Sequence, residues 1–225
     1  MQYTKYGITL IHLMEQEIEL VRNWRNDPIV AKNHEFQKYI TREEQQKWFR
    51  SIQNINNAYF VIRYEGSNVG VINAKNIEWE QHAFESGIFI PDPLAYNTFI
   101  PAVISIMMTD LFFRVFLWEK IYAHILKTNL PVIRYNQMLG YTLCDGQKDI
   151  DNQLYELTSE MFDQTAGKLL NAMKTVMGQD DDSVILIEPG DERYPVVMHV
   201  ETQIIQGNPF LKKQTKTDAG RAYYF

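Results

Sequence analysis

The sequence predicts an α/β protein with a mixed, mostly antiparallel central sheet that is flanked by helices. Two amphipathic segments follow the first predicted strand, three alternating segments separated by short turns come next, and two later helices each join one strand to another. Hairpins make antiparallel pairs, whereas a helical crossover between neighbouring strands makes a parallel pair. The 225 residues are enough for one well-packed core and a small appended unit.

The first predicted elements are a strand and two helices. Gly7–Leu13 alternates and is rich in β-forming residues, which predicts a strand. Apolar residues recur at helical spacing over Glu15–Asn26, and this helix is expected to end before Asp27-Pro28. Thr41 and Glu44 have the spacing of a capping box, so a second helix is expected to begin there.

The apolar period changes to two after residue 57. Ala58–Tyr64 and Val69–Ala74 are predicted strands, and Glu65–Asn68 between them has the composition of a hairpin turn. Phe84–Ile90 is a third predicted strand, closed by Pro91-Asp-Pro93. These segments predict an antiparallel meander.

A long helix and a second set of strands complete the first 160 residues. Apolar residues cover most of the circumference between Ile100 and Val115, which predicts a buried helix. Gly140 is a suitable C-cap for a short helix before it. The other predicted elements here are the strand Lys120–Leu126, the helix Pro131–Leu139, and two strands near Tyr141–Cys144 and Gln153–Leu157.

Residues 161–225 are predicted to form a C-terminal extension of the domain formed by residues 1–160. Glu160–Met177 is expected to be an amphipathic helix, followed by a polar break at Gly178–Asp182. Ser183–Ile187 and Tyr194–Val200 flank the turn Glu188–Glu192 and are predicted strands of a hairpin. We expect this helix and strand pair to cover a sheet edge, to shape a pocket, or to join two protomers as a homodimer.

Composition excludes several classes of function. The net charge is −6 and the longest basic run is Lys212-Lys213, so no nucleic-acid partner is expected. The single cysteine, Cys144, cannot form an intramolecular disulfide, and the five histidines show no metal-ligand spacing, so no metal site is expected. The sequence shows no signal peptide and no uncharged membrane span, so the protein is expected to be soluble and cytoplasmic.

Four strings of residues, in order and at plausible spacing, resemble the GNAT superfamily of acetyl-CoA-dependent N-acetyltransferases. They are Trp24–Pro28 (Trp-Arg-Asn-Asp-Pro), Val69–Ile72, Glu85–Ile90 and, above all, Asn129–Tyr141. The last string is similar to the family's Asn-x-x-Ala-Ile-x-x-Tyr-x-x-Leu-Gly-Phe segment. The resemblance extends over residues 6–160.

The resemblance implies a GNAT-like fold and direct transfer of an acetyl group from acetyl-CoA, the co-substrate, to a primary amine of a small molecule. The Trp-Arg-Asn-Asp start is similar to the branch that holds amino-sugar acetyltransferases and ribosomal-protein N-terminal acetyltransferases. An amino sugar linked to a nucleotide is therefore one suggested acceptor. Two alternatives stay open: a non-catalytic protein of this fold that binds a ligand or a partner, and a protein N-terminal acetyltransferase.

Glu85 is the first candidate catalytic residue. Removing the proton of an alkylammonium with a pKa of about 10.4 costs roughly 4–5 kcal/mol at pH 7, and a positioned carboxylate can relay that proton. A carboxylate within an apolar strand is costly unless it faces a wet cavity. In members of the family that this sequence resembles, a glutamate at this point of the fourth strand often serves as the general base. The alternative is a rim residue, or a residue paired with a nearby arginine.

The resemblance also implies where acetyl-CoA is held. Backbone amides of Ile88, Phe89 and Ile90 are expected to bind the pantetheine and the thioester carbonyl, because family members splay this strand from the next one. Gly87 and the proline stop after the strand agree with a strand that loses its neighbour there.

The expected diphosphate loop departs from the family pattern, since Leu94–Pro101 contains neither glycine nor a basic residue. Asn97 is expected to cap the following helix, so that Asn97, Thr98 and Phe99 are the candidate phosphate-binding positions. The alternative is an ordinary capped helix start.

Tyr135 and Asn136 are candidates for assisting the leaving thiolate. Counted from Asn129, the tyrosine common in the family falls on Asn136, while Tyr135 lies about 100° away around a helix. An amide cannot act as a general acid at neutral pH, although it can donate a hydrogen bond to sulfur. Asn129 is expected to face the cofactor at the open end of the sheet. Core packing is the alternative role of Tyr135.

Three further polar residues have open assignments. His124 lies opposite Ala123 and Ile125 by strand alternation, where it either lines the acceptor cleft or is a hydrogen-bonded sheet histidine. Arg25 and Asn26 either fix an entrance loop over the amine site or are surface and capping residues.

Overall fold

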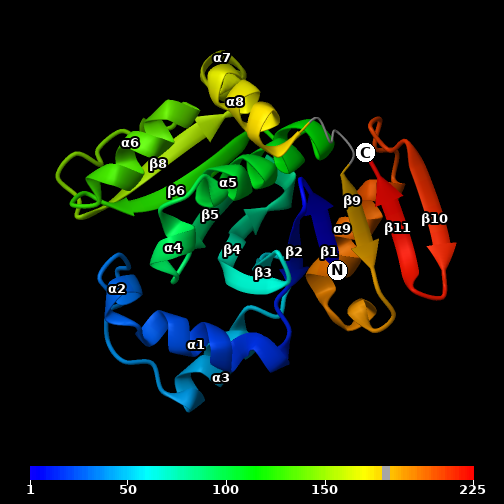
Figure 1. Ribbon diagram of the computed structural model, residues 1–225, viewed down its shortest axis with the longest axis horizontal. Helices are drawn as coiled ribbons and strands as arrows, with labels where there is room; N and C mark the ends of the chain where they lie inside the picture. Colours follow the sequence, from blue (N-terminus) through cyan, green and yellow to red (C-terminus); the bar gives the residue numbers. More distant parts are fainter. Residues whose placement is uncertain (179–182) are drawn as a thin grey trace.

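The computed structural model describes residues 1–178 and 183–225, and its strands in this part of the chain form one sheet. Their bounds are Gln2–Lys5 (β1), Ile8–His12 (β2), Ala58–Tyr64 (β3), Ser67–Glu78 (β4), Ala83–Phe89 (β5), Lys120–Leu126 (β6), Thr142–Leu143 (β7), Asn152–Thr158 (β8), Val184–Ile187 (β9), Lys213–Thr217 (β10) and Gly220–Tyr224 (β11). The 11 strands have the order β10-β11-β9-β1-β2-β3-β4-β5-β6-β8-β7 (Figure 1).

Helices cover both faces of this sheet. Their bounds are Ile18–Asn26 (α1), Pro28–Ala31 (α2), Arg42–Ser51 (α3), Pro93–Tyr96 (α4), Ile100–Asp110 (α5), Leu130–Leu139 (α6), Ser159–Thr165 (α7), Gly167–Met177 (α8) and Pro195–Ile205 (α9). A π-helical turn, Leu111–Val115, continues α5. No helix in the described ranges is both long enough and apolar enough to cross a membrane.

Strand alternation divides the sheet into two faces. The larger core lies between one face and α5, where Ile72, Phe84 and Ile104 are almost fully buried. A smaller cluster on the other face joins Val21 of α1 and Phe49 of α3 to strands β3 and β4. We call this second face, which also carries Lys75, Glu85, Phe89 and His124, the α1 face.

The predicted mixed α/β sheet is confirmed. Each ladder is antiparallel except the one between β5 and β6, which is parallel, as the first predicted helical crossover requires. The second predicted crossover, through α6, joins β6 to β7, but these strands are not neighbours because β8 lies between them. The strand predicted at Ala58–Tyr64 has those bounds. The capping box of Thr41 and Glu44 is present at the start of α3, and Gly140 ends α6 with φ 104°.

The C-terminal extension continues the central sheet. β9 pairs with β1, for example Tyr3 with Ile185, and β11 pairs with β9. Figure 1 shows these strands prolonging the sheet beyond β1, with α9 beside them. Val197 and Ile204 of α9 are fully buried in the larger core. The extension therefore shares the hydrophobic core of residues 1–160.

Several sequence predictions for the extension were wrong. Tyr194–Val200 was expected to be a strand but lies mostly in helix α9, because Pro195 occupies the first helical turn and Val196, Val197 and Ile204 share its buried side. The hairpin is formed instead by β10 and β11. The single helix expected over Glu160–Met177 is two helices, α7 and α8, which meet at Ala166. The predicted polar break falls largely on residues 179–182, outside the described residues.

Candidate active site

β5 and β6 pair over only part of their length. The parallel ladder joins Ala83 to Lys120, Phe84 to Ile121 and Glu85 to Tyr122. β5 continues to Phe89 and β6 to Leu126, but within the described ranges no further pair joins them. The family resemblance implied that this strand would lose its neighbour, and the separation begins directly after Glu85. Backbone groups beyond this point face a neighbour with which they form no ladder.

Glu85 is buried at this branch point and three side chains hold its carboxylate. Its exposed fraction is 7%. Lys75 Nζ lies 2.7 Å and His124 Nδ1 2.9 Å from Oε1, while Asn76 Nδ2 donates to Oε2 at 3.1 Å. Burial raises the pKa of Glu85, but Lys75 and His124 outweigh this effect, so the net change is a lowered pKa. The carboxylate is therefore ionised at neutral pH.

His124 extends from β6 onto the α1 face, opposite Ala123 and Ile125, as alternation predicts. Its side chain is 38% exposed, in contrast to the buried carboxylate that it contacts. The bond to Glu85 uses Nδ1, so the other ring nitrogen, Nε2, is not the atom engaged in this pair. The sequence placed both residues in neighbouring strands but did not identify the contact, since strand alternation alone does not give the register between two strands.

The loop after α2 is tied to α1 by the two polar residues singled out in the sequence. Asn26 exchanges two hydrogen bonds with the backbone of Ile40, at 2.9 Å and 2.8 Å. Arg25 Nη2 donates to the carbonyl oxygen of Phe36 at 3.3 Å. These bonds tie the loop to α1, and its role as an entrance over the amine site stays a prediction.

Aromatic rings and orphaned polar atoms surround Phe89 on the α1 face. The guanidinium of Arg25 lies 5.9 Å from the Phe89 ring centroid and the ring of His34 lies 5.5 Å from it. Burial, followed by Arg25 and Lys75, lowers the pKa of His34 to about 4, so His34 is neutral at pH 7. Arg25 Nη1 and Asn73 Oδ1 are buried without a hydrogen-bond partner. Such unpaired polar atoms mark a place where a ligand can supply the missing bonds.

Tyr135, Asn136 and Asn129 lie on or next to α6. The hydroxyl of Tyr135 donates to the carbonyl oxygen of Ala102 at 3.2 Å, and burial raises its pKa. The side-chain amide of Asn136 donates to the backbone of Val132 at 2.9 Å. This geometry favours the packing role of Tyr135. Asn129 precedes α6 as its N-cap residue and makes no side-chain cap hydrogen bond.

Comparison with known proteins identifies the family. Residues 8–142 match the acetyltransferase (GNAT) domain, which is more than half of the chain. The chain belongs to the GNAT acetyltransferase family. It is an acetyl-CoA-dependent N-acetyltransferase, in agreement with the activity implied by the sequence.

Individual GNAT relatives resemble this chain at moderate to low identity. Acetyltransferase PseH of Campylobacter jejuni is 28% identical over 142 residues, which are 61% of this chain and 84% of PseH. The crystal structure of C. jejuni PseH in complex with acetyl coenzyme A has a TM-score of 0.51 at 21% identity, covering 67% of this chain and 98% of that one. Spermidine N-acetyltransferase from Vibrio cholerae, solved with CoA and spermine, has a TM-score of 0.59 at 14% identity, covering 70% and 99%. These structures support the shared GNAT fold.

The splayed strands suit the acetyl-CoA co-substrate of a GNAT enzyme. β5 beyond Glu85 forms a ladder with β4 up to Phe89 on one side only. Amides on its other side are therefore available to the pantetheine and to the thioester carbonyl. The predicted positions Ile88, Phe89 and Ile90 lie on or directly after this segment, and their contact with the cofactor stays a prediction.

The expected diphosphate loop has a different arrangement from the one predicted. Asn97 ends the short helix α4 and its side chain donates to Pro93 at 2.8 Å, so the expectation that it caps the long helix is wrong. Phe99 is the N-cap residue of α5, and Thr98 Oγ1 accepts the N–H of Ile100 at 3.2 Å. The N–H of Ile100 is thus already engaged, and Pro101 has no N–H, so neither of these two first-turn positions can donate to a phosphate.

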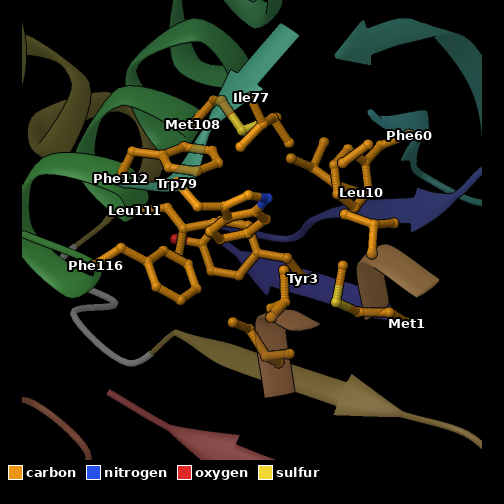
Figure 2. Close-up of a pocket in the computed structure, with 14 residues that line it drawn as sticks. Met1, Tyr3, Leu10, Phe60, Ile77, Trp79, Met108, Leu111, Phe112 and Phe116 are labelled. Carbon is orange, nitrogen blue, oxygen red and sulfur yellow. The ribbon is translucent and has the colours of Figure 1, made fainter. Parts of the chain in front are cut away.

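A separate apolar cavity of about 30 Å³ lies within the larger core. Figure 2 shows Tyr3, Leu10, Trp79, Met108 and Phe112 around it, contributed by β1, β2, the start of a 3-10 turn and the α5 segment. The volume is that of about one or two water molecules, and the lining is apolar. This cavity lies on the opposite face of the sheet from Glu85.

Proposed function

We propose that this GNAT enzyme acetylates the primary amine of an amino sugar that carries a phosphate group, such as a sugar linked to a nucleotide. The observation that carries the proposal is the charge of the α1 face. Lys75 contacts Glu85 of β5. Arg25 lies over the ring of Phe89, which is on the same strand as Glu85. Two fixed cations against one carboxylate favour an acceptor with a negative group in addition to its amine.

The same charges argue against a polyamine acceptor. The V. cholerae neighbour is a spermidine N-acetyltransferase, but at 14% identity it shares the fold alone. A polyamine carries several positive charges and requires carboxylates around it. On the α1 face Glu85 is already paired with Lys75, and the Arg25 guanidinium lies nearby with one unpaired buried donor.

Two features support a compact acceptor. The Trp24–Pro28 string resembles the branch that holds amino-sugar acetyltransferases together with ribosomal-protein N-terminal acetyltransferases. Arg25 and Asn26 hold the loop that includes Phe36 and Ile40 against α1, so this loop is positioned beside the α1 face. An acceptor that binds there can satisfy Arg25 Nη1 with a phosphate oxygen and Asn73 Oδ1 with a hydroxyl.

The proposed chemistry uses the branch point of the strands. The carboxylate of Glu85 assists removal of the proton from the acceptor ammonium. A backbone amide among Ile88, Phe89 and Ile90 stabilises the tetrahedral oxyanion. Asn129 contributes a polar group at the cofactor side, where its side chain makes no capping bond. Asn136 donates to its own helix, so solvent supplies the proton of the departing thiolate.

Binding of acetyl-CoA and transfer to acceptors test the proposal in sequence. Calorimetry with acetyl-CoA, CoA and dephospho-CoA measures the affinity with which a protein that lacks glycine in Leu94–Pro101 binds the co-substrate. Release of free thiol is then followed with a nucleotide-linked amino sugar, the free amino sugar, spermidine and a peptide with a free N-terminus. We expect turnover of the nucleotide-linked sugar at the highest kcat/KM. Preferential turnover of the peptide or of spermidine contradicts the proposed acceptor, and so does absence of turnover with the nucleotide-linked sugar.

An arginine variant tests the proposed phosphate contact. We expect Arg25→Gln to raise the KM for a phosphate-bearing acceptor by roughly tenfold or more, since a charge-assisted bond contributes about 1.5–3 kcal/mol. The KM for the free amino sugar should change much less. An equal effect on both acceptors contradicts a contact between Arg25 and the phosphate.

A further inference from the structure

The arrangement of Glu85 and His124 differs from that of a lone carboxylate base. Oε1 of Glu85 accepts from Lys75 and from His124, and Oε2 accepts from Asn76. Both oxygens therefore already have partners in a residue that is 7% exposed. Oε2 keeps one lone pair, but the burial of Glu85 gives a bulky ammonium poor direct access to it.

We infer that His124 removes the proton of the acceptor ammonium, with Glu85 as the residue that positions its ring. This inference rests on the proposed amine acetylation. In the neutral ring, Nδ1–H donates to Glu85 Oε1, and Nε2 is left as the acceptor atom. A buried carboxylate that orients a histidine through Nδ1 also stabilises the imidazolium formed when Nε2 takes a proton.

The position of His124 suits this role. Tyr122 is the last β6 residue paired with β5, and His124 lies two residues further along, where the strands have separated. Its side chain is 38% exposed, so Nε2 can be reached from the side of the acceptor.

Charged and titratable groups on each neighbouring element shape this site. Lys75 of β4 and Glu85 of β5 lie on one side, and they are paired with each other. Tyr59 of β3 lies near enough to Glu85, and His34 near enough to Lys75, for an electrostatic effect. On β6 the nearest group on the same face is Tyr122, and across the ladder to β8 the residue opposite His124 is the apolar Leu154. Further along on that side, Lys120 and Glu156 form an ion pair with each other at 3.0 Å.

The protons balance in the proposed transfer. His124 Nε2 takes one proton from the acceptor R–NH₃⁺, and the neutral amine forms a C–N bond to the thioester carbonyl carbon. Collapse of the tetrahedral intermediate breaks the C–S bond, and the second amine proton leaves to protonate the thiolate by way of water. His124 then releases its proton to solvent, so the products are the amide, CoA–SH and one proton.

Kinetics of matched variants test the inference. We expect His124→Gln to lower kcat by roughly 10²–10⁴-fold, the usual contribution of general base catalysis, with unchanged calorimetric binding of acetyl-CoA. Glu85→Gln should lower kcat as well, and the double variant should be no worse than His124→Gln, because the two residues act as one unit. The acidic limb of the wild-type pH–rate profile should be absent in His124→Gln. His199→Gln, a change on α9 at a ring that packs against Trp79 beside the larger core, should leave the profile as in the wild type.

Two outcomes overturn the inference while leaving the proposed function intact. One is turnover by His124→Gln at the wild-type rate with the acidic limb retained. The other is a ring of His124 with its proton on Nε2, measured by two-bond ¹H–¹⁵N NMR of the resting enzyme, since Nε2 would then be unable to accept. Failure of the wild-type enzyme to acetylate any amine removes the proposed function, and the inference with it.

Discussion

The hydroxyl of Tyr135 lies 3.2 Å from the carbonyl oxygen of Ala102, and this hydrogen bond joins α6 to the first turn of α5. Both helices adjoin the strands that separate at the candidate site. Because the hydroxyl is buried and its pKa is raised, Tyr135 is a poor donor of its proton to a thiolate in this geometry.

We therefore expect Tyr135→Phe to reduce stability more than activity. Loss of one neutral hydrogen bond should lower the free energy of unfolding by about 1 kcal/mol, measured by urea denaturation. The turnover rate should stay within about twofold of the wild type, since a change of about 0.4 kcal/mol or less in the barrier is expected. A roughly hundredfold slower turnover at unchanged stability would restore Tyr135 as the candidate acid.

Gly140 is required by its backbone conformation and by its neighbours. Its φ is +104°, and an added Cβ would lie 2.5 Å from Thr165 Oγ1 and 3.0 Å from the carbonyl oxygen of Met161. We expect Gly140→Ala to cost roughly 2–4 kcal/mol of unfolding free energy, because left-handed strain and a clash with α7 add together.

Gly66 provides the matched control for this clash. Its φ is +78°, but nothing lies within 4 Å of an added Cβ. Gly66→Ala should therefore show only the backbone penalty, about 1 kcal/mol. Equal losses for the two variants, measured by thermal and urea unfolding, would mean that α7 yields to the added methyl group.

His12 should make the protein less stable in acid. It is 4% exposed and packs against Tyr194 with ring centroids 4.7 Å apart. Burial lowers its pKa from 6.5 to about 4, with a smaller contribution from the N-terminal amine. Above pH 6.5 the ring is neutral in both states, whereas below it the unfolded chain binds a proton that the folded chain does not. Stability from this group is therefore lost as the pH falls from 6.5 to 4, by roughly 3 kcal/mol.

Replacing His12 by phenylalanine tests this effect. The slope of unfolding free energy against pH between about 6.5 and 4.5 should decrease by about one proton, or about 1.36 kcal/mol per pH unit. His34 has a similarly lowered pKa, so part of the acid sensitivity should persist in the variant. The prediction would be contradicted if the curves of unfolding free energy against pH were parallel for the wild type and the variant. An NMR titration of His12 with a midpoint near the ordinary histidine pKa of 6.5 would also contradict it.

Glu201 should stabilise the extension only when it is ionised. It is 5% exposed, and it accepts hydrogen bonds from Arg221 and Tyr223 of β11. Burial raises the pKa of Glu201, but these two partners outweigh it and the net change is a lowered pKa. The stabilisation is therefore fully present above the ordinary value of 4.5 and is lost as the pH falls below it.

We expect Glu201→Gln to lower the unfolding free energy by roughly 2–4 kcal/mol at pH 7, since it leaves Arg221 with Glu192 as its remaining carboxylate partner. The difference between the variant and the wild type should shrink below the ordinary pKa of 4.5. Glu192→Gln, at an exposed end of the same network, should cost much less, because solvent screens that ion pair. A difference that is independent of pH would contradict a role for the ionised carboxylate.

Local signals in the sequence predicted much of the fold. The strand Ala58–Tyr64, the capping box at Thr41 and the C-cap at Gly140 depend on neighbouring residues in the chain, and all three are confirmed. The helix α9 was missed because Pro195 and the valines after it are compatible with either a strand or a helix start. Packing of Val197 against the larger core, which a local pattern does not contain, selects the helix.

The candidate site was predictable in part. Glu85 could be singled out because a carboxylate in an apolar strand is costly. The end of β5–β6 pairing was implied by the family resemblance, and Gly87 and the prolines after the strand agree with it without requiring it. The contact with His124 depends on the register of two strands joined through α4 and α5, which no nearby residue determines. Asn97 was misassigned because it ends the short helix α4, whereas α5 begins only at Ile100 and has Phe99 as its N-cap residue.

The placement of β1 between β2 and β9 has a consequence for biosynthesis. Tyr3 of β1 pairs with Ile185 of β9, which the ribosome adds to the chain much later. At about 5–20 residues per second, β1 waits roughly ten to forty seconds for this partner, and one edge of the nascent sheet stays unprotected meanwhile. A chaperone that shields unpaired strand edges should thus matter more for the yield of this protein during translation than during refolding of the finished chain.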